Sequence, residues 1–179
     1  MAFPSFASGD VLTATDMNAV GLWLVKTQTV GSAVSSVNVT SAFSASYLHY
    51  RIVYIGGSAS ADGDLRLTLG AAATGYYMAF QYVAYGGTTP VGVSDNNAAR
   101  WSTAGSHRTT ANSLIVDLFN PFASDETGMA GFYSAMKAGS VAGSFAGFLN
   151  NTTSYSDFTI TPSSGTLTGG VIYVYGYKP

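Results

Sequence analysis

Asp157-Phe-Thr-Ile-Thr-Pro-Ser-Ser-Gly-Thr-Leu-Thr-Gly-Gly-Val-Ile-Tyr-Val-Tyr-Gly-Tyr-Lys-Pro179 is the stretch that decides the predicted fold. Pro162 and the glycines at positions 165, 169 and 170 favour turns. They separate an alternating run over residues 158–161 from an apolar run over residues 171–177. The pattern predicts a strand, a connection and a closing strand.

The closing strand carries apolar or aromatic side chains on both faces. Because strand side chains alternate, Tyr173, Tyr175 and Tyr177 share one face, and Ile172 and Val174 share the other. A strand without a polar face is normally covered on both sides. We therefore expect this strand to complete a sheet between two layers, with its tyrosines in the core or in a subunit contact.

The chain from residue 22 onward is a series of short strand-like runs between clusters of Gly, Ser, Ala and Asp. The clearest alternation places Leu65, Leu67 and Leu69 opposite polar neighbours. This spacing predicts an all-β protein, an antiparallel β-sandwich of the jelly-roll type. Besides the C-terminal unit, strands are expected over 22–30, 36–43, 48–55, 64–69, 112–119, 131–136 and 144–149.

Two regions between these strands have a less regular pattern. The aromatic run over residues 76–85 could be a strand or part of a loop, because it has no clear period. Residues 86–98 contain Gly86, Gly87, Pro90 and Gly92, which predicts a long surface loop. Residues 105–108 predict a second, polar loop.

Residues 1–21 differ from the rest of the chain, so we divide it into an N-terminal segment of residues 1–21 and a β domain of residues 22–179. The spacing from Thr13 to Asp16 is that of a helix N-terminal capping box, which predicts one short helix after an extended arm. Aromatic side chains of such an arm must dock on the same chain or on a neighbour. If the segment docks on a partner protein, the contact residues are Phe3, Phe6, Leu12 and Met17.

The composition favours a protein that is covered by neighbours. Charged residues make up 9% of the chain and the net charge is -2, which offers no basic stripe for nucleic acid. A chain with so few charges has little electrostatic defence against self-association, so we expect an assembly subunit, a homo-oligomer. No apolar run suits membrane insertion or a secretion signal, and synthesis in the cytoplasm is expected.

No residue pattern points to catalysis, a cofactor or a metal. Cysteine is absent, and His49 and His107 lie in no recognised catalytic motif. Asp62 and Asp64 flank a glycine, but the calcium-loop pattern does not continue beyond them, so a β-turn is favoured. We expect a protein that is not an enzyme and that binds no cofactor.

The chain's twelve tyrosines leave two interpretations open. Tyrosine is an ordinary strand residue, and exposed tyrosine beside polar groups is also a common way of holding a sugar. Beside the expected long loop, four tyrosines are candidates for glycan contact: Tyr76, Tyr77, Tyr82 and Tyr85.

Phe6-Ala-Ser-Gly-Asp-Val-Leu-Thr-Ala-Thr-Asp-Met-Asn18 resembles the opening of many tailed-bacteriophage structural proteins, including tail-fibre, minor tail and appendage subunits. Later phrases are similar to the β-rich domains of such proteins. They are Phe43-Ser-Ala-Ser-Tyr47, Tyr50-Arg-Ile-Val53, Asn120-Pro-Phe122, Gly165-Thr-Leu-Thr-Gly-Gly170 and Tyr175-Gly-Tyr-Lys178.

The resemblance implies a virion component that docks through its N-terminal segment on other virion proteins and presents a β domain. It also implies a homotrimer, and it identifies no receptor-binding residue. The leading hypothesis is a tail-fibre or tail-appendage subunit, with a capsid decoration or head-fibre protein as the structural alternative. The alternative from another class is a glycan-binding module for host attachment. A sugar-degrading enzyme would need paired carboxylates that the sequence does not indicate.

Overall fold

The computed structural model describes residues 8, 9, 11, 21–135 and 140–177, and every regular element in this part of the chain is a β-strand. All paired strands are antiparallel, which confirms the predicted all-β class. The helix expected over residues 13–20 lies outside the described residues. The strands are β1 (Leu22–Thr29), β2 (Val37–Val39), β3 (His49–Gly56), β4 (Ser58–Ala59), β5 (Gly63–Leu69), β6 (Tyr76–Ala84), β7 (Val91–Ala98), β8 (Trp101–His107), β9 (Asn112–Phe119), β10 (Thr127–Ser134), β11 (Val141–Leu149), β12 (Phe158–Pro162), β13 (Leu167–Thr168) and β14 (Val171–Tyr177).

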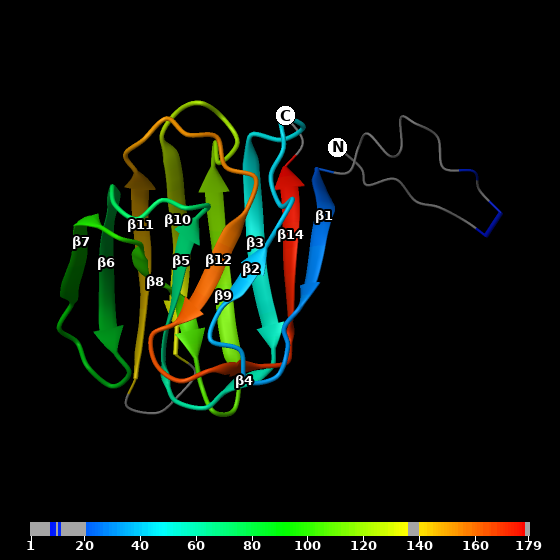
Figure 1. Ribbon diagram of the computed structural model, residues 1–179. Coiled ribbons are helices and arrows are strands. Elements are labelled where there is room, and N and C mark those ends of the chain that lie inside the picture. The colour runs from blue at the N-terminus through cyan, green and yellow to red at the C-terminus, as the bar shows by residue number, and fades with distance from the viewer. Residues whose placement is uncertain (1–7, 10, 12–20, 136–139, 178–179) are drawn as a thin grey trace.

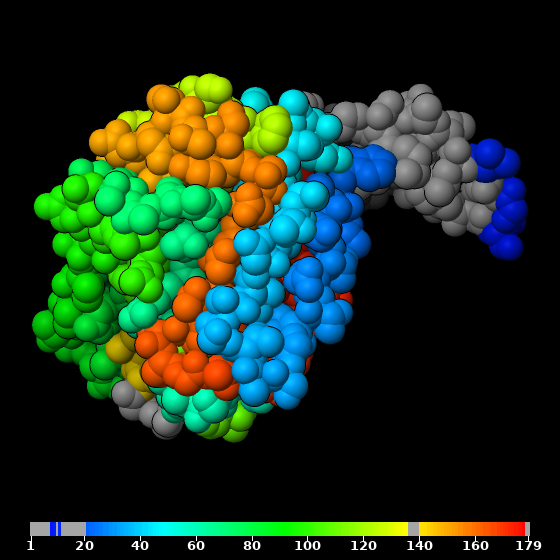
Figure 2. Space-filling view, in the orientation of Figure 1, coloured from blue at the N-terminus to red at the C-terminus, as the bar shows by residue number. Residues whose placement is uncertain are grey.

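A large layer contains the longer strands in the order β1-β14-β3-β9-β10-β11-β6-β7. A small layer, β2-β12-β5-β8, lies over one face of it (Figure 1). Figure 2 shows the near face, where the orange segment around β12 runs across the molecule between the green and blue parts. The layers are joined by hydrogen-bonded pairing of β8 with β9, where Ser106 faces Ser113.

Large side chains from both layers fill the space between them. Phe43, in the loop before β3, places its ring 4.8 Å from that of Tyr50 in the large layer and 5.6 Å from that of Phe158 in the small layer. Trp101 of β8 packs edge-on against Tyr76 of β6, with ring centroids 5.0 Å apart. The predicted alternation in β5 is confirmed, since Leu65, Leu67 and Leu69 are fully buried.

The closing strand β14 lies between β1 and β3. Ile172 and Val174 point into the core and are fully buried. Tyr173 and Tyr175 lie half-buried on the outside of the large layer, so they are not core residues, and the alternative of a subunit contact stays a prediction. One side of β14 therefore faces the core, and its tyrosine side faces the surface.

Two predicted loops are strands. Residues 91–98 form β7, which pairs with β6 at the edge of the large layer. Polar side chains and glycine are tolerated there because an edge strand faces solvent on its open side. Residues 101–107 form the buried strand β8, in which Ser106 donates a hydrogen bond to the carbonyl of Ser134. The aromatic run that the sequence left open is the strand β6.

Candidate functional site

The outer face of the large layer, which points away from the small layer, carries large apolar side chains that solvent reaches. Phe132 is 78% exposed, and Ile55 and Leu24 are more than half exposed. Exposed apolar groups gathered on one face mark a binding or assembly surface. The others on this face are Leu22, Ile115, Phe119 and Phe148.

Strand register arranges the outward residues in rows that cross the large layer. In one row, Ala130 of β10 faces Ala146 of β11, which faces Ala79 of β6. We call these three residues the alanine row. It is continued by Asp117 of β9 on one side and by Ser94 of β7 on the other.

A groove of about 760 Å³ lies over the alanine row. Alanine side chains extend only one carbon above the sheet, so they form a low floor between taller neighbours. Ile115 and Phe132 line one side, and Arg51 and Asp117 line one end. A volume of this size falls within the range of about 300–1,000 Å³ in which proteins hold small ligands.

Aromatic side chains occupy the next outward row. Tyr77 stacks on Phe148 with ring centroids 5.0 Å apart, and His49 packs edge-on against Phe119 at 5.2 Å. Gly128 separates the two pairs in the strand order, and a side chain there would meet the Phe119 ring. This row therefore forms an apolar border beside the alanine row.

Arg51 and Asp117 form a two-pronged ion pair at the end of the groove. Arg51 Nε donates to Asp117 Oδ1 at 2.8 Å, and Nη2 donates to Oδ2 at 2.7 Å. Tyr177 donates from its hydroxyl to the same carboxylate at 3.2 Å. The hydrogen bond with Asp117 raises the pKa of Arg51, so the guanidinium stays charged.

The polar side chains of the groove floor have no hydrogen-bond partner among the described residues. Gln81 of β6, Ser144 of β11 and Ser94 of β7 point outward and are exposed. None of these side chains makes a hydrogen bond to another described residue. A ligand lying on the alanine row would meet these groups.

The four tyrosines predicted to contact glycan occupy different environments. Tyr76 is fully buried, and its hydroxyl accepts a hydrogen bond from the Leu69 backbone N–H at 2.8 Å, so it is closed to any ligand. Burial also raises the pKa of Tyr76 to about 12. Tyr82 packs against Phe80, and Tyr85 is 45% exposed with its hydroxyl 2.9 Å from Ser134 Oγ. Tyr77 alone borders the alanine row.

The predicted docking residues Phe3, Phe6, Leu12 and Met17 all lie outside the described residues. Their role stays a prediction.

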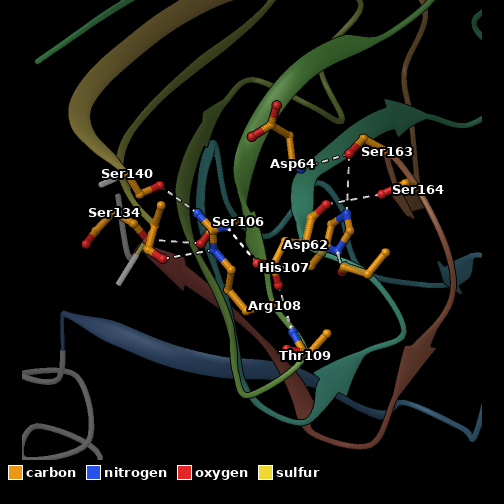
Figure 3. A network of polar contacts seen from close by, with 12 residues as sticks. Asp62, Asp64, Ser106, His107, Arg108, Thr109, Ser134, Ser140, Ser163 and Ser164 are labelled. Carbon is orange, nitrogen blue, oxygen red and sulfur yellow. Dashed lines mark hydrogen bonds and ion pairs between the residues drawn. The ribbon is translucent and has the colours of Figure 1, made fainter. Parts of the chain in front are cut away.

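A second cluster of polar side chains surrounds His107 at one end of the molecule (Figure 3). His107 Nδ1 lies 2.8 Å from the carbonyl of Ala61, and Nε2 lies 3.4 Å from Ser163 Oγ. Arg108 pairs with Asp62 at 3.3 Å and donates to the Ala135 carbonyl and to Ser140 Oγ. The cluster joins strand ends from both layers.

The geometry around His107 leaves no room for a substrate. His107 is fully buried, and a side chain on Gly63 would come within 2.7 Å of His107 Nε2. Burial lowers the pKa of His107, while the Asp64 and Asp62 carboxylates oppose that effect. The cluster ties loops to strand ends, and Asp62 serves here as the partner of Arg108.

The residues of the groove were missed in the sequence because no local pattern marks them. Ala79, Ala130 and Ala146 come from three separate strands, and only the strand order and register bring them together. One residue of the groove had an indication in the sequence. The position of Phe132 in the expected strand 131–136 puts its side chain on the face opposite that of Tyr133.

Comparison with known proteins gives no match to a protein family, a curated protein or a solved structure. The described residues include no helix with the length and apolar character that crossing a membrane requires. They also include no group of three or more side chains suited to binding a metal ion.

Proposed function

We propose that the protein is a non-enzymatic structural subunit of a tailed-bacteriophage virion, of the tail-fibre or tail-appendage type. Residues 1–21 attach it to a virion partner, and the β domain of residues 22–179 associates with copies of itself as a trimer. The phrase from Phe6 to Asn18 supports the attachment role through its resemblance to phage structural proteins. The two packed layers support a β-sandwich, and the jelly-roll connection pattern stays a prediction.

The observation that carries the assembly role is an apolar patch on the outer face of β1, β14 and β3. Ile55 faces Val171, Val53 faces Tyr173, and Leu24 faces Tyr175. We call these six residues the tyrosine patch. Tyr173 and Tyr175 stack with their ring centroids 6.3 Å apart, between the apolar side chains of β1 and β3.

A second copy of the chain is the occupant that this patch suits best. When two copies of the chain bring the same patch together, an unpaired charge on it would face a like charge on the other copy. Like charges opposed across an interface cost several kcal/mol, so the patch must carry no unbalanced charge. Arg51 and Asp117, at the border of the patch, neutralise each other. The low charge of the whole chain, with a net value of -2, keeps repulsion between copies small.

Light scattering after size-exclusion chromatography tests self-association of the full chain. We expect a trimer, and we expect Ile55→Asp or Tyr173→Asp to shift it toward the monomer because each places a charge in the apolar contact. Asn38→Asp adds the same charge to an exposed position of the small layer and should leave the trimer intact. A monomeric wild-type chain, or equal effects of all three variants, would contradict the assembly role.

Deletion of residues 1–21 tests the attachment role. Particles assembled with the truncated subunit should lack it, while the full chain should be incorporated and visible by labelled electron microscopy on the tail. Incorporation of the truncated chain would rule out docking by this segment. Labelling on the head would replace the tail assignment with a capsid decoration or head fibre.

A further inference from the structure

We infer that the groove over the alanine row is a carbohydrate-binding site for a neutral sugar. Phe132 supplies the surface on which the sugar ring stacks, and Gln81, Ser94 and Ser144 supply hydrogen bonds to its hydroxyls. The groove reaches Arg51 of β3, which also borders the tyrosine patch, but none of the six residues of that patch lines the groove. The site therefore does not depend on the proposed function.

The first argument is the exposure of Phe132. Its side chain is 78% exposed at the groove, and its ring contacts no other aromatic ring among the described residues. An apolar ring held on a rigid strand loses little conformational freedom on binding and offers a flat face. The carbon-bound hydrogens of a sugar ring suit such a face, as aromatic side chains pack against apolar surfaces.

The second argument is the order of the neighbours of Phe132 across the sheet. Phe132 faces Ser144, and Ser144 faces Gln81. Outward residues of paired strands lie about 5 Å apart. A ring stacked on Phe132 therefore has a hydroxyl and an amide beside it, and neither is used by another described residue.

The chemistry of the groove selects a neutral polyhydroxylated ligand over the other classes. A purely apolar ligand would cover Gln81 and Ser144 without pairing them, which costs free energy. An anionic ligand would have to compete with Asp117 for Arg51, whose guanidinium is bound at 2.8 and 2.7 Å. A neutral sugar pairs the hydroxyl and amide groups and leaves that ion pair intact.

The alanine row explains how the ring of a bound sugar can lie close to the sheet. Ala79 and Ala146 are exposed and extend little above the backbone, so a flat ligand can lie against the strands. A large side chain at either position would fill the groove from outside without entering the core. A substitution of Ala79 or Ala146 by a large residue should therefore block the groove without disturbing the fold.

The test uses the full chain on a printed array of neutral oligosaccharides and bacterial surface polysaccharides. We expect selective binding of neutral glycans, which titration calorimetry with the bound soluble oligosaccharide then measures. Phe132→Ala should weaken binding by about tenfold or more, as loss of a central aromatic contact does. Ala146→Phe should abolish it, and Ile55→Ala, an exposed apolar change outside the groove, should leave it unchanged.

Circular dichroism and light scattering of the same variants separate loss of the site from loss of fold or assembly. A silent array overturns the inference, as does binding that Phe132→Ala and Ala146→Phe leave unchanged. Binding restricted to anionic glycans and suppressed by salt also overturns it. If a synthetic peptide of residues 1–20 binds and Ala146→Phe prevents this, the groove takes a protein segment and the sugar assignment is wrong.

Discussion

His107 shows how a single residue couples the stability of this fold to pH. Its ring is fully buried, and the groups that face it are the Asp62 and Asp64 carboxylates, the Arg108 guanidinium and the Ser163 hydroxyl. Burial disfavours the charged imidazolium and lowers the pKa of His107 below its usual 6.5. The folded protein therefore holds a neutral histidine at pH values where the unfolded chain already binds a proton.

From this difference we predict that the free energy of unfolding falls as the pH drops below about 6.5. The contribution of neutral His107 to the free energy of unfolding is complete above that pH. It is lost as the pH falls toward the lowered pKa of His107 in the folded protein. Urea unfolding at pH 5 to 8 measures the slope of the free energy of unfolding against pH. His107→Gln should flatten it, whereas His49→Gln, a change at the exposed histidine, should not. An equal slope in the wild type and in His107→Gln would contradict the assignment.

The Arg51–Asp117 pair is well formed but partly exposed, with 39% and 26% of the two side chains accessible. Solvent screens such pairs, and their measured coupling is usually below about 1 kcal/mol. We predict a small, favourable coupling of about 0.5–1 kcal/mol from a double-mutant cycle with Arg51→Met and Asp117→Asn. Urea unfolding at two salt concentrations measures it, and high salt should reduce it. A coupling of several kcal/mol would show that the pair is far more shielded than its exposure indicates.

At the scale of elements, the connection into β14 depends on backbone conformation. Gly170 has a φ of +84°, and a Cβ there would lie 2.7 Å from the Ile55 carbonyl oxygen. Gly170→Ala should therefore lower the free energy of unfolding by more than about 1 kcal/mol, through both strain and contact.

Gly21→Ala is the matched control for Gly170→Ala. Gly21 has open space around its Cα and no positive φ, so the same added methyl group should be close to neutral. Thermal unfolding followed by circular dichroism compares the two. Equal effects would mean that the connection tolerates an ordinary backbone conformation.

Strands with one wet and one buried face could be predicted from the sequence. β5 and β9 have strict alternation, and their bounds lie within one residue of the expected ones. β7 and β8 were missed because small and polar residues dominate them, with Gly, Ser, Asp and Asn in β7 and with Ser, Thr, Ala and Gly in β8. Their strand conformation comes from tertiary pairing with β6 and β5, which local preference does not reveal.

The groove could not be predicted, for a different reason. Ala79, Ala130 and Ala146 belong to three different strands, and a shift of one residue in a pairing would turn an alanine inward. The sequence singled out Tyr76 through its place in an aromatic run, yet alternation in β6 buries Tyr76 and turns Tyr77 outward. Which face of β6 points outward is decided by the strands that pair with it, and the local sequence does not identify those strands.

For the whole molecule, we predict a single cooperative unfolding transition of the β domain. The pairing of β8 with β9 makes the two layers one hydrogen-bonded unit, and they share one core. The chain's two tryptophans report on distant parts of it, since Trp23 lies on β1 and Trp101 on β8.

Single-tryptophan variants measure this cooperativity. In Trp101→Phe, the fluorescence of Trp23 should change at the same denaturant concentration as the far-ultraviolet circular dichroism signal. The same coincidence is expected for Trp101 fluorescence in Trp23→Phe. An earlier transition at Trp23 would show that the edge of the large layer, β1 and β14, opens separately.

The position of β14 has a consequence for how the protein matures on the ribosome. β14 follows β1 and β3 in the chain, and it is hydrogen-bonded between them. Until residues 171–177 leave the exit tunnel, β1 has nothing to pair with and one edge of β3 stays bare. A nascent chain therefore cannot complete this side of its main sheet until the seven residues of β14 have emerged, and their arrival covers both neighbouring strand edges.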